Sequence, residues 1–221
     1  MINAKELKAR LIQIISDIKR LSGKNRKKEN ICSKMEMYKQ LIDGYSNNIK
    51  RASYQKMYCR FYCAYRMTSK LSRAKKIRAW KRYFQLLQEQ RELKRELKDI
   101  IDELLLVTRR REVSYGSKLI ATEDPNRPVI DFFVRIELDI TPPDRNSDDF
   151  VDDWCSIYVE IEKIYGEVLA GNDGRDFVKQ FDEVFPSLKD LTPVKKMDIL
   201  LWQGSRLVPG GKKSRCQRSQ S

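Results

Sequence analysis

A basic and aromatic segment between Gly44 and Gln88 contains the residues best suited to binding chemistry. It has a dozen Lys and Arg residues, no Asp or Glu, and interspersed aromatic residues. Guanidinium and ammonium groups bind phosphate oxygens and aromatic rings stack on bases, so the composition predicts a negatively charged partner. That partner is nucleic acid, an acidic helix of another chain, or an acidic calcium-sensor protein that wraps basic helices. The possible nucleic-acid contacts are Arg60, Arg66, Lys70, Arg73, Lys75, Lys76 and Arg78.

Residues that could support catalysis or hold a metal ion are few. The chain has no His, and its five Cys residues are odd in number and scattered, so we predict no metal site, no cofactor and no imidazole base. The carboxylates Asp148, Asp149, Asp152 and Asp153 lack a basic counterpart, and capping of a helix N-terminus explains them. We therefore expect a protein that is not an enzyme and has no small-molecule substrate.

Charge divides the 221 residues into unequal parts. Residues 1–112 carry 30 Lys and Arg against 12 Asp and Glu, residues 113–205 carry 10 against 19, and residues 206–221 add a net +5. This asymmetry predicts a basic helical region, a small acidic head and a disordered basic tail with those boundaries. No apolar run is long enough to span a bilayer and no leading signal segment is present, so we expect a soluble intracellular protein without membrane contact.

Apolar residues recur at heptad spacing through the first 112 residues. Neither Gly nor Pro occurs between Tyr45 and Tyr115, which allows a continuous helix over residues 53–112, roughly 90 Å long at 1.5 Å per residue. Such a helix needs a partner that buries its apolar stripe. The residues predicted to form this seam are Leu7, Leu11, Ile14, Ile18, Tyr54, Tyr58, Phe61, Tyr65, Leu97, Ile100 and Leu104.

Two packings could bury the seam. The chain could fold back as an antiparallel bundle with turns near Gly23 and Gly44, or it could form a coiled coil with an acidic partner chain in a hetero-oligomer. Because the acid-free segment offers few internal ion pairs, we favour the coiled coil with an acidic partner. The heptad spacing of the aromatic residues likewise favours a buried seam over an exposed stacking platform.

The pattern changes after residue 113. Apolar and polar residues alternate over residues 130–140, which predicts a half-buried strand, and the preceding Asp124–Pro128 predicts a turn. Helices are then predicted from an apolar stripe between Phe150 and Val168 and from a Phe-rich segment that follows Asn172. Thr192-Pro193 is typical of the N-cap and first position of a last helix.

This order of elements resembles the smaller subunits of the outer-kinetochore microtubule-attachment complex, whose heads are RWD-like. The matching residues are Ile120–Pro125, Pro128, Phe132, Leu138, the Ile157–Val168 stripe, Asn172-Asp173, Phe177, Phe181 and Phe185. The resemblance implies a parallel coiled coil with a sister subunit and paired heads that bind centromere-linked adaptors.

The expected fold class is thus mostly α, with long coiled-coil helices followed by a small α+β, RWD-like head. By resemblance, the expected function is that of a non-enzymatic assembly subunit in a kinetochore-type complex that links centromeric adaptors to microtubule-binding subunits. Its location would be the nucleus and kinetochore, or alternatively the cytoplasm. Lys24–Lys28 is compatible with a nuclear signal and with a solvated charged turn. The alternative function is that of a basic helical nucleic-acid-binding protein.

Overall fold

The computed structural model of the chain describes residues 1–20 and 25–207, except the side chains of residues 25–32, 35, 64–65, 172–173 and 205–207. Within these ranges all regular structure is helical and no strand occurs. The helices are α1 (Ala4–Arg20), α2 (Asn25–Asn48), α3 (Ala52–Phe61), α4 (Arg73–Leu93), α5 (Leu97–Thr108), α6 (Val113–Glu123), α7 (Phe132–Glu137), α8 (Phe150–Ala170), α9 (Asn172–Val184) and α10 (Pro193–Leu207), with 3₁₀ helices η2 (Ala64–Thr68) and η3 (Pro186–Leu188).

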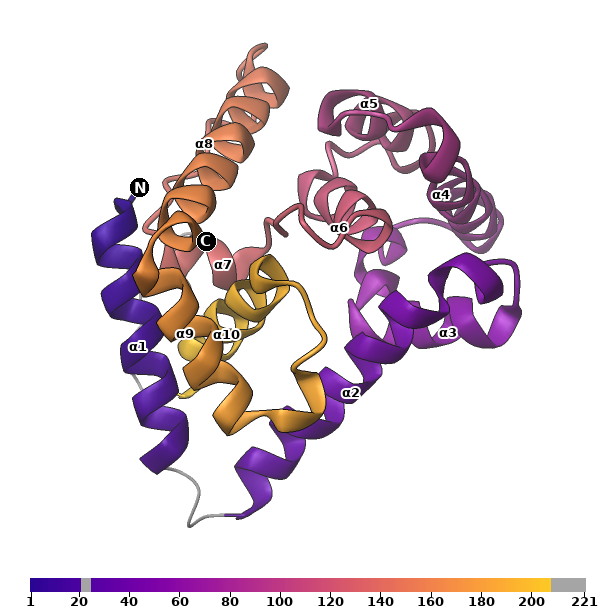
Figure 1. The fold of residues 1–221 in the computed structure, drawn as a ribbon. Helices are drawn as coiled ribbons and strands as arrows, with labels where there is room; N and C mark the ends of the chain where they lie inside the picture. Colours follow the sequence, from indigo (N-terminus) through magenta and orange to yellow (C-terminus); the bar gives the residue numbers. More distant parts are fainter. Residues whose placement is uncertain (21–24, 208–221) are drawn as a thin grey trace.

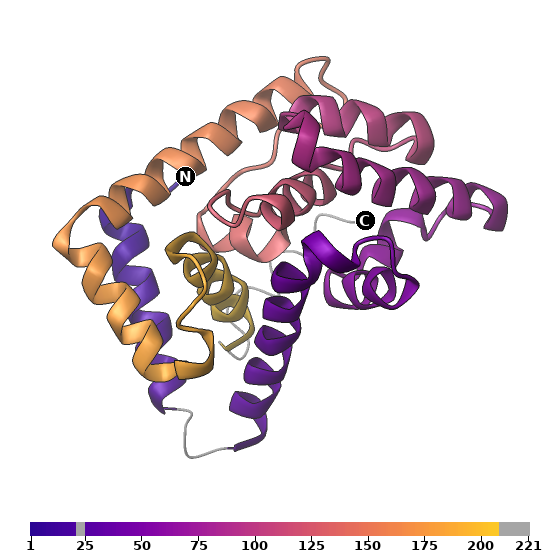
Figure 2. The ribbon, with the colours of Figure 1, turned by 45° about the vertical axis from the view of Figure 1, so that its right-hand side comes forward.

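The helices form two groups joined through the middle of the molecule. Helix α1 packs against α8, α9 and α10 on one side, and α4 packs against α5 and α6 on the other (Figure 1). Helix α2 runs between the groups and contacts α3, α6 and η3, while α7 packs on α10 (Figure 2). Buried apolar residues from all ten α-helices belong to one connected core, which crosses the predicted boundary at residues 112 and 113.

The predicted continuous helix over residues 53–112 is wrong. Three residues with left-handed backbone interrupt it: Cys63 (φ 50°), Lys94 (φ 46°) and Arg109 (φ 60°). Helices α3, η2, α4 and α5 therefore follow one another as separate elements. Because these residues end helices without Gly or Pro, the lack of Gly and Pro did not indicate a single helix.

The predicted long coiled coil is therefore also wrong as a fold class. The apolar stripes of the short helices pack on one another within the chain. The turn predicted near Gly44 lies inside α2, and the chain turns after Asn48, whose C=O accepts a hydrogen bond from the N–H of Arg51 (2.8 Å). The turn predicted at Gly23 lies outside the described residues.

The predicted strand over residues 130–140 is wrong, because this segment contains helix α7. The Asp131 carboxylate caps the helix by accepting hydrogen bonds from two backbone N–H groups, the shorter of 2.9 Å. Within α7 the side chain of Val134 is buried, and so is that of Leu138 at its C-cap, four residues later, whereas Phe132 is exposed. The alternation therefore contained a helical pattern, and the structure contradicts an α+β, RWD-like head.

The predictions for the last helices are confirmed. The apolar stripe that begins at Phe150 forms α8, and the Phe-rich segment forms α9. Helix α10 begins at Pro193, and the Thr192 hydroxyl accepts a hydrogen bond from the backbone N–H of Lys195 (3.3 Å), as expected of an N-cap. Helix α10 continues to Leu207, and the predicted tail beyond it lies outside the described residues.

Helix α1 is tied to the second half of the chain by polar contacts as well as by its apolar face. The backbone N–H of Ile2 donates to the C=O of Leu138 (3.0 Å). The Arg10 guanidinium donates to the C=O of Glu137 and forms an ion pair with Asp139 (3.4 Å). Leu11 and other apolar residues of α1 are fully buried beneath these contacts. The two ends of the described chain thus share one packed unit.

A buried ion pair fixes the extended segment before α7 to helix α10. Lys195 Nζ donates to Asp198 Oδ2 (2.5 Å) and to the C=O of Arg127 (2.6 Å). The Asp198 carboxylate also accepts from the Tyr165 hydroxyl (3.1 Å) and from the backbone N–H of Val129 (3.2 Å). Burial lowers the pKa of Lys195 and raises the pKa of Asp198, because both charged forms have lost their hydration.

Candidate nucleic-acid interface

The acid-free segment starts in the last turn of α2 and continues through α3, η2 and α4 as far as Gln88, and α3, η2 and α4 lie together on one side of the molecule (Figure 1). We call the cations of this side the basic surface. Eleven of its members lack an ion pair with any carboxylate of the described residues: Lys50, Arg51, Lys56, Arg60, Arg66, Lys70, Arg73, Lys75, Lys76, Arg78 and Lys81.

The twelfth cation of the segment is neutralised. Arg82 is half-buried and forms ion pairs with Glu103 (2.8 Å) and Glu89 (3.5 Å). It lies at the end of the acid-free segment, where carboxylates return to the sequence. The remaining cations have no carboxylate partner among the described residues, and their summed potential attracts anions to this side.

The structure brings the predicted nucleic-acid contacts together. Arg60 lies on α3, Arg66 on η2, and Lys70 in the following turn, all exposed. On α4, Arg73, Lys75 and Arg78 are exposed and Lys76 is half-buried. Sequence reasoning did not select Lys50, Arg51, Lys56 and Lys81, although the boundaries of the acid-free segment already included them.

Most of the described aromatic residues of the segment are buried and hold its helices in place. The hydroxyls of Tyr58 on α3 and Tyr83 on α4 are hydrogen-bonded to each other (2.7 Å), and the Tyr83 hydroxyl also donates to the C=O of Tyr115 (3.2 Å). The Tyr54 hydroxyl donates to the C=O of Leu41 on α2 (2.8 Å). Burial raises the pKa of Tyr58 and Tyr83 well above the ordinary value, so both hydroxyls stay protonated. This internal support leaves the cations on the outside.

The predicted seam residues lie mostly in the core of the chain itself. Leu7, Leu11, Ile14 and Ile18 of α1, Tyr54 and Tyr58 of α3, and Leu97, Ile100 and Leu104 of α5 are buried, and Phe61 is partly buried. The side chain of Tyr65 is not among those described. Contact of these residues with a partner helix stays a prediction, and the buried ones could make it only by leaving the core.

A groove of about 610 Å³ lies between α3 and α4 within the basic surface. Cys59, Trp80 and Phe84 form its apolar part, and Lys56 and Lys81 line it as well. The rings of Trp80 and Phe84 are stacked, with centroids 5.9 Å apart. Burial raises the pKa of the Cys59 thiol to about 11, so the thiol is neutral and contributes apolar surface.

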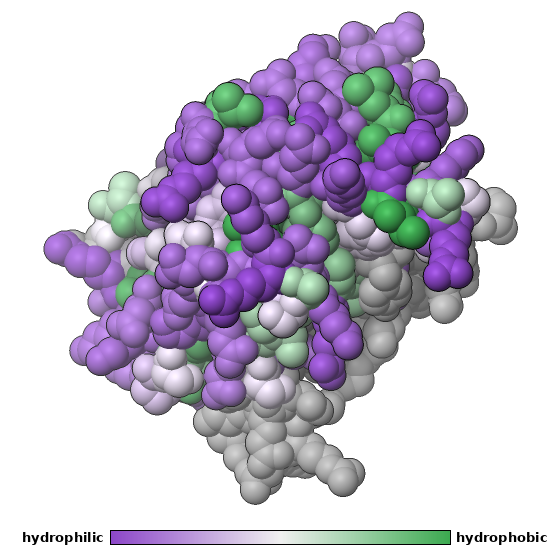
Figure 3. Space-filling view, turned by 90° about the vertical axis from the view of Figure 1, so that its right-hand side faces the viewer, coloured by the Kyte–Doolittle hydropathy of each residue, from purple (hydrophilic) through white to green (hydrophobic). Residues whose placement is uncertain are grey.

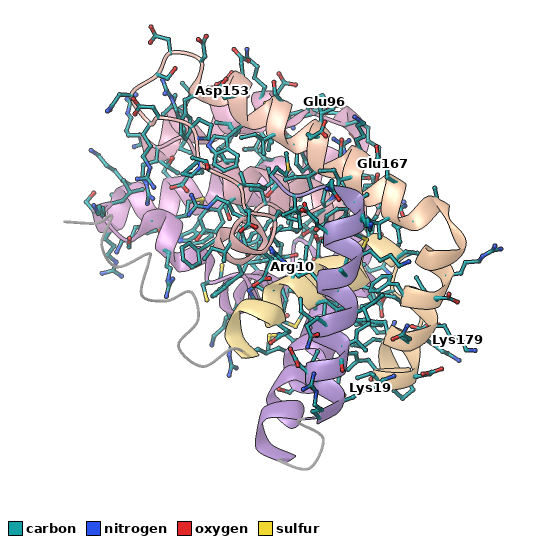
Figure 4. All side chains as sticks on the ribbon, turned by 90° about the vertical axis from the view of Figure 1, so that its left-hand side faces the viewer. Arg10, Lys19, Glu96, Asp153, Glu167 and Lys179 are labelled. Atoms are coloured by element: carbon teal, nitrogen blue, oxygen red, sulfur yellow. The ribbon has the colours of Figure 1, made fainter. Side chains whose placement is uncertain are left out.

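The side opposite the basic surface differs from it in charge. The side that carries α3 and α4 is mostly hydrophilic, with hydrophobic residues in separate patches (Figure 3). On the opposite side both signs of charge occur, since Lys19 and Lys179 accompany Glu96, Asp153 and Glu167 (Figure 4). On that side Lys19 pairs with Glu183 (3.7 Å). A concentration of cations without a carboxylate partner among the described residues therefore distinguishes the basic surface.

Other kinds of site have less support among the described residues. They contain no group of His, Cys, Asp or Glu side chains that could hold a metal ion. Of the carboxylates at the start of α8, Asp152 forms an ion pair with Lys98 (2.5 Å). No described helix is both long enough and apolar enough to cross a lipid bilayer.

Fold and surface together define an all-helical protein with one strongly basic side. No known protein family, curated protein or solved structure matches the chain. The interpretation of function therefore depends on the basic surface itself.

Proposed function

We propose that this protein binds nucleic acid through the basic surface of α3, η2 and α4. The observation that carries the proposal is the set of eleven cations on one side of the molecule, none with a carboxylate partner among the described residues. Their spread along successive helices matches the repeated negative charges of a phosphate backbone.

Burial of the apolar seam supports nucleic acid over an acidic partner helix. A coiled-coil partner needs an exposed apolar stripe beside the charges. The stripe residues Tyr54, Tyr58 and Ile100 are buried within the chain, whereas the cations remain outside. Phosphate binding requires exposed cations, and all of the eleven except Lys76 are exposed.

The predicted kinetochore role has lost its structural basis. That role, with its kinetochore location, came from a resemblance to RWD-like heads, and the described residues form no such head. The acidic coiled-coil partner in a hetero-oligomer was predicted separately, from heptad spacing and charge. The kinetochore role stays a prediction, and no contact or surface among the described residues supports it.

The salt dependence of binding tests the proposal. Binding to a single strand releases condensed counterions, and the slope of log K against log salt is about −0.7 per phosphate contact. Replacing Arg66, Lys70 and Arg73 by Ala should therefore flatten the slope by about 2 if all three contact phosphates. Fluorescence anisotropy of a labelled oligothymidylate measures the affinity at each salt concentration.

A matched variant separates local contact from total charge. Lys5→Ala, Lys163→Ala and Lys179→Ala remove the same number of charges from α1, α8 and α9, and all three side chains are exposed. This control should leave the slope close to that of the unchanged protein. Equal flattening in both triple variants would show that net charge alone attracts the strand, and absence of binding at low salt would refute the proposal.

A further inference from the structure

Building on the proposed function, we infer that the groove between α3 and α4 binds an unpaired base. The protein would then bind single-stranded nucleic acid in preference to a duplex. The groove lies inside the basic surface, and its volume of about 610 Å³ falls within the range of sites that enclose small molecules. In a duplex every base is stacked and paired, and unstacking one costs a few kcal/mol, so a single strand supplies this occupant more readily.

The aromatic part of the groove is held rigidly for stacking. Trp80 is stacked on Phe84 at 5.9 Å and meets the edge of Tyr83 at 6.2 Å between ring centroids. Phe84 in turn contacts the ring of Tyr58 at 5.8 Å. Trp80 is only half-buried, and the part of it that these rings do not cover lines the groove. A ring fixed in this way stacks on a base with little loss of side-chain entropy.

The polar part of the groove matches the other chemical groups of a nucleotide. Lys56 on α3 and Lys81 on α4 are exposed, line the groove, and make no ion pair with a described residue, so both can bind phosphate oxygens. Gln88 is half-buried in the groove, and its amide makes no hydrogen bond within the described part of the chain. A free amide supplies a donor and an acceptor for the edge of a base.

Charge favours a nucleotide over an apolar segment of a protein in this groove. The ammonium groups that line it would have to lose part of their hydration against an apolar side chain without gaining a counter-charge. A strand brings the apolar ring and the phosphate together in one repeating unit. The groove and the surrounding cations then act on the same ligand.

The experiment compares two single strands of equal charge, an oligothymidylate of about 12 nucleotides and a strand of the same length whose sugars carry no bases. The intact chain should bind the base-bearing strand more tightly. Trp80→Ala should weaken binding of the base-bearing strand by roughly 5- to 150-fold, the usual range for one lost stacking contact, and leave the abasic strand almost unaffected. Ile77→Ala is the matched control, since Ile77 lies one turn earlier on α4, is exposed, and does not line the groove.

A second variant guards against loss of folding. Ala52 is exposed at the start of α3 and lines the groove, so Ala52→Leu fills the space without removing a core residue. It should also reduce the preference for the base-bearing strand, while circular dichroism stays unchanged. Equal binding of both strands, unaffected by either variant, would refute the groove inference and leave the proposed function standing. If neither strand binds, both proposals are refuted. Binding of an acidic helical peptide in the groove, in the absence of binding to either strand, would have the same meaning.

Discussion

The buried pair of Lys195 and Asp198 allows a sharp test of the packing between α10 and the segment before α7. In Asp198→Asn, the Lys195 ammonium stays buried beside the C=O of Arg127 but has lost its counter-charge. In Lys195→Met, the carboxylate stays buried with two donors, the Tyr165 hydroxyl and the Val129 N–H. Each single change leaves one uncompensated charge in the core, and each should lower the free energy of unfolding by about 3–5 kcal/mol.

The double variant should be far more stable than the sum of the two single changes. With Lys195→Met and Asp198→Asn together no charge remains, and the Asn oxygen can still accept hydrogen bonds from Val129 and Tyr165. We expect a loss of about 0–2 kcal/mol, whereas independent effects would add to about 6–10 kcal/mol. Urea denaturation followed by far-ultraviolet circular dichroism gives these values, provided that the slope with urea is the same in all four proteins. Additive losses would refute the view that Lys195 and Asp198 stabilise the fold only as a pair.

Two further predictions concern close packing and thiol chemistry. A Cβ atom at Gly204 would lie 2.6 Å from Ile14 Cδ1, so Gly204→Ala should destabilise the contact of α10 with α1 by about 1–3 kcal/mol. Ile14→Val removes that carbon but keeps Cγ1, which would lie 3.0 Å from the new Cβ, so it should restore part of the loss. Thermal unfolding of the single and double variants measures both effects, and a double variant no better than Gly204→Ala would contradict the steric explanation. Because burial raises the pKa of Cys59 to about 11, alkylation of this thiol should be slow at pH 8 and should accelerate up to about pH 11, as the thiolate forms. Mass spectrometry of peptides follows the reaction, with Cys59→Ser to identify the site, and fast alkylation at pH 8 in the folded protein would contradict the assigned burial.

Local signals predicted the last helices well. The stripe that begins at Phe150 and the Thr192-Pro193 pair each act over a single helix, so neighbouring residues carry the information. The acidic residues do lie at the start of α8, but the side chain of its N-cap, Asp149, makes no capping hydrogen bond. The strand predicted around Val134 is wrong because an alternating pattern is ambiguous over a short segment. Residues four apart share one face in a strand and also in a helix. The Asp131 cap was the signal that distinguished the two. Breaks at Lys94 and Arg109 had no such signal, since a left-handed residue other than Gly depends on tertiary packing.

The basic surface could be predicted from composition, because charge that the chain does not neutralise stays outside wherever its helices go. The groove could not be predicted from the sequence. Lys56 and Cys59 on α3 and Trp80 and Phe84 on α4 are distant in sequence, and only the spacing of the two helices brings them together. The helix that covers each apolar stripe could not be predicted either. Heptad spacing is the same whether the covering helix belongs to the same chain or to another chain.

The position of α1 has a consequence for how the protein is made. Its apolar face is covered by α8, α9 and α10, which leave the ribosome only after most of the chain has been synthesised. At usual rates of translation, that delay is on the order of ten seconds. During this time Leu7, Leu11 and Ile15 have no native surface from α8, α9 or α10 to bury them, and they are open to chaperones or to wrong contacts with other chains. The yield of folded protein in a cell is thus expected to depend on how α1 is protected during that interval.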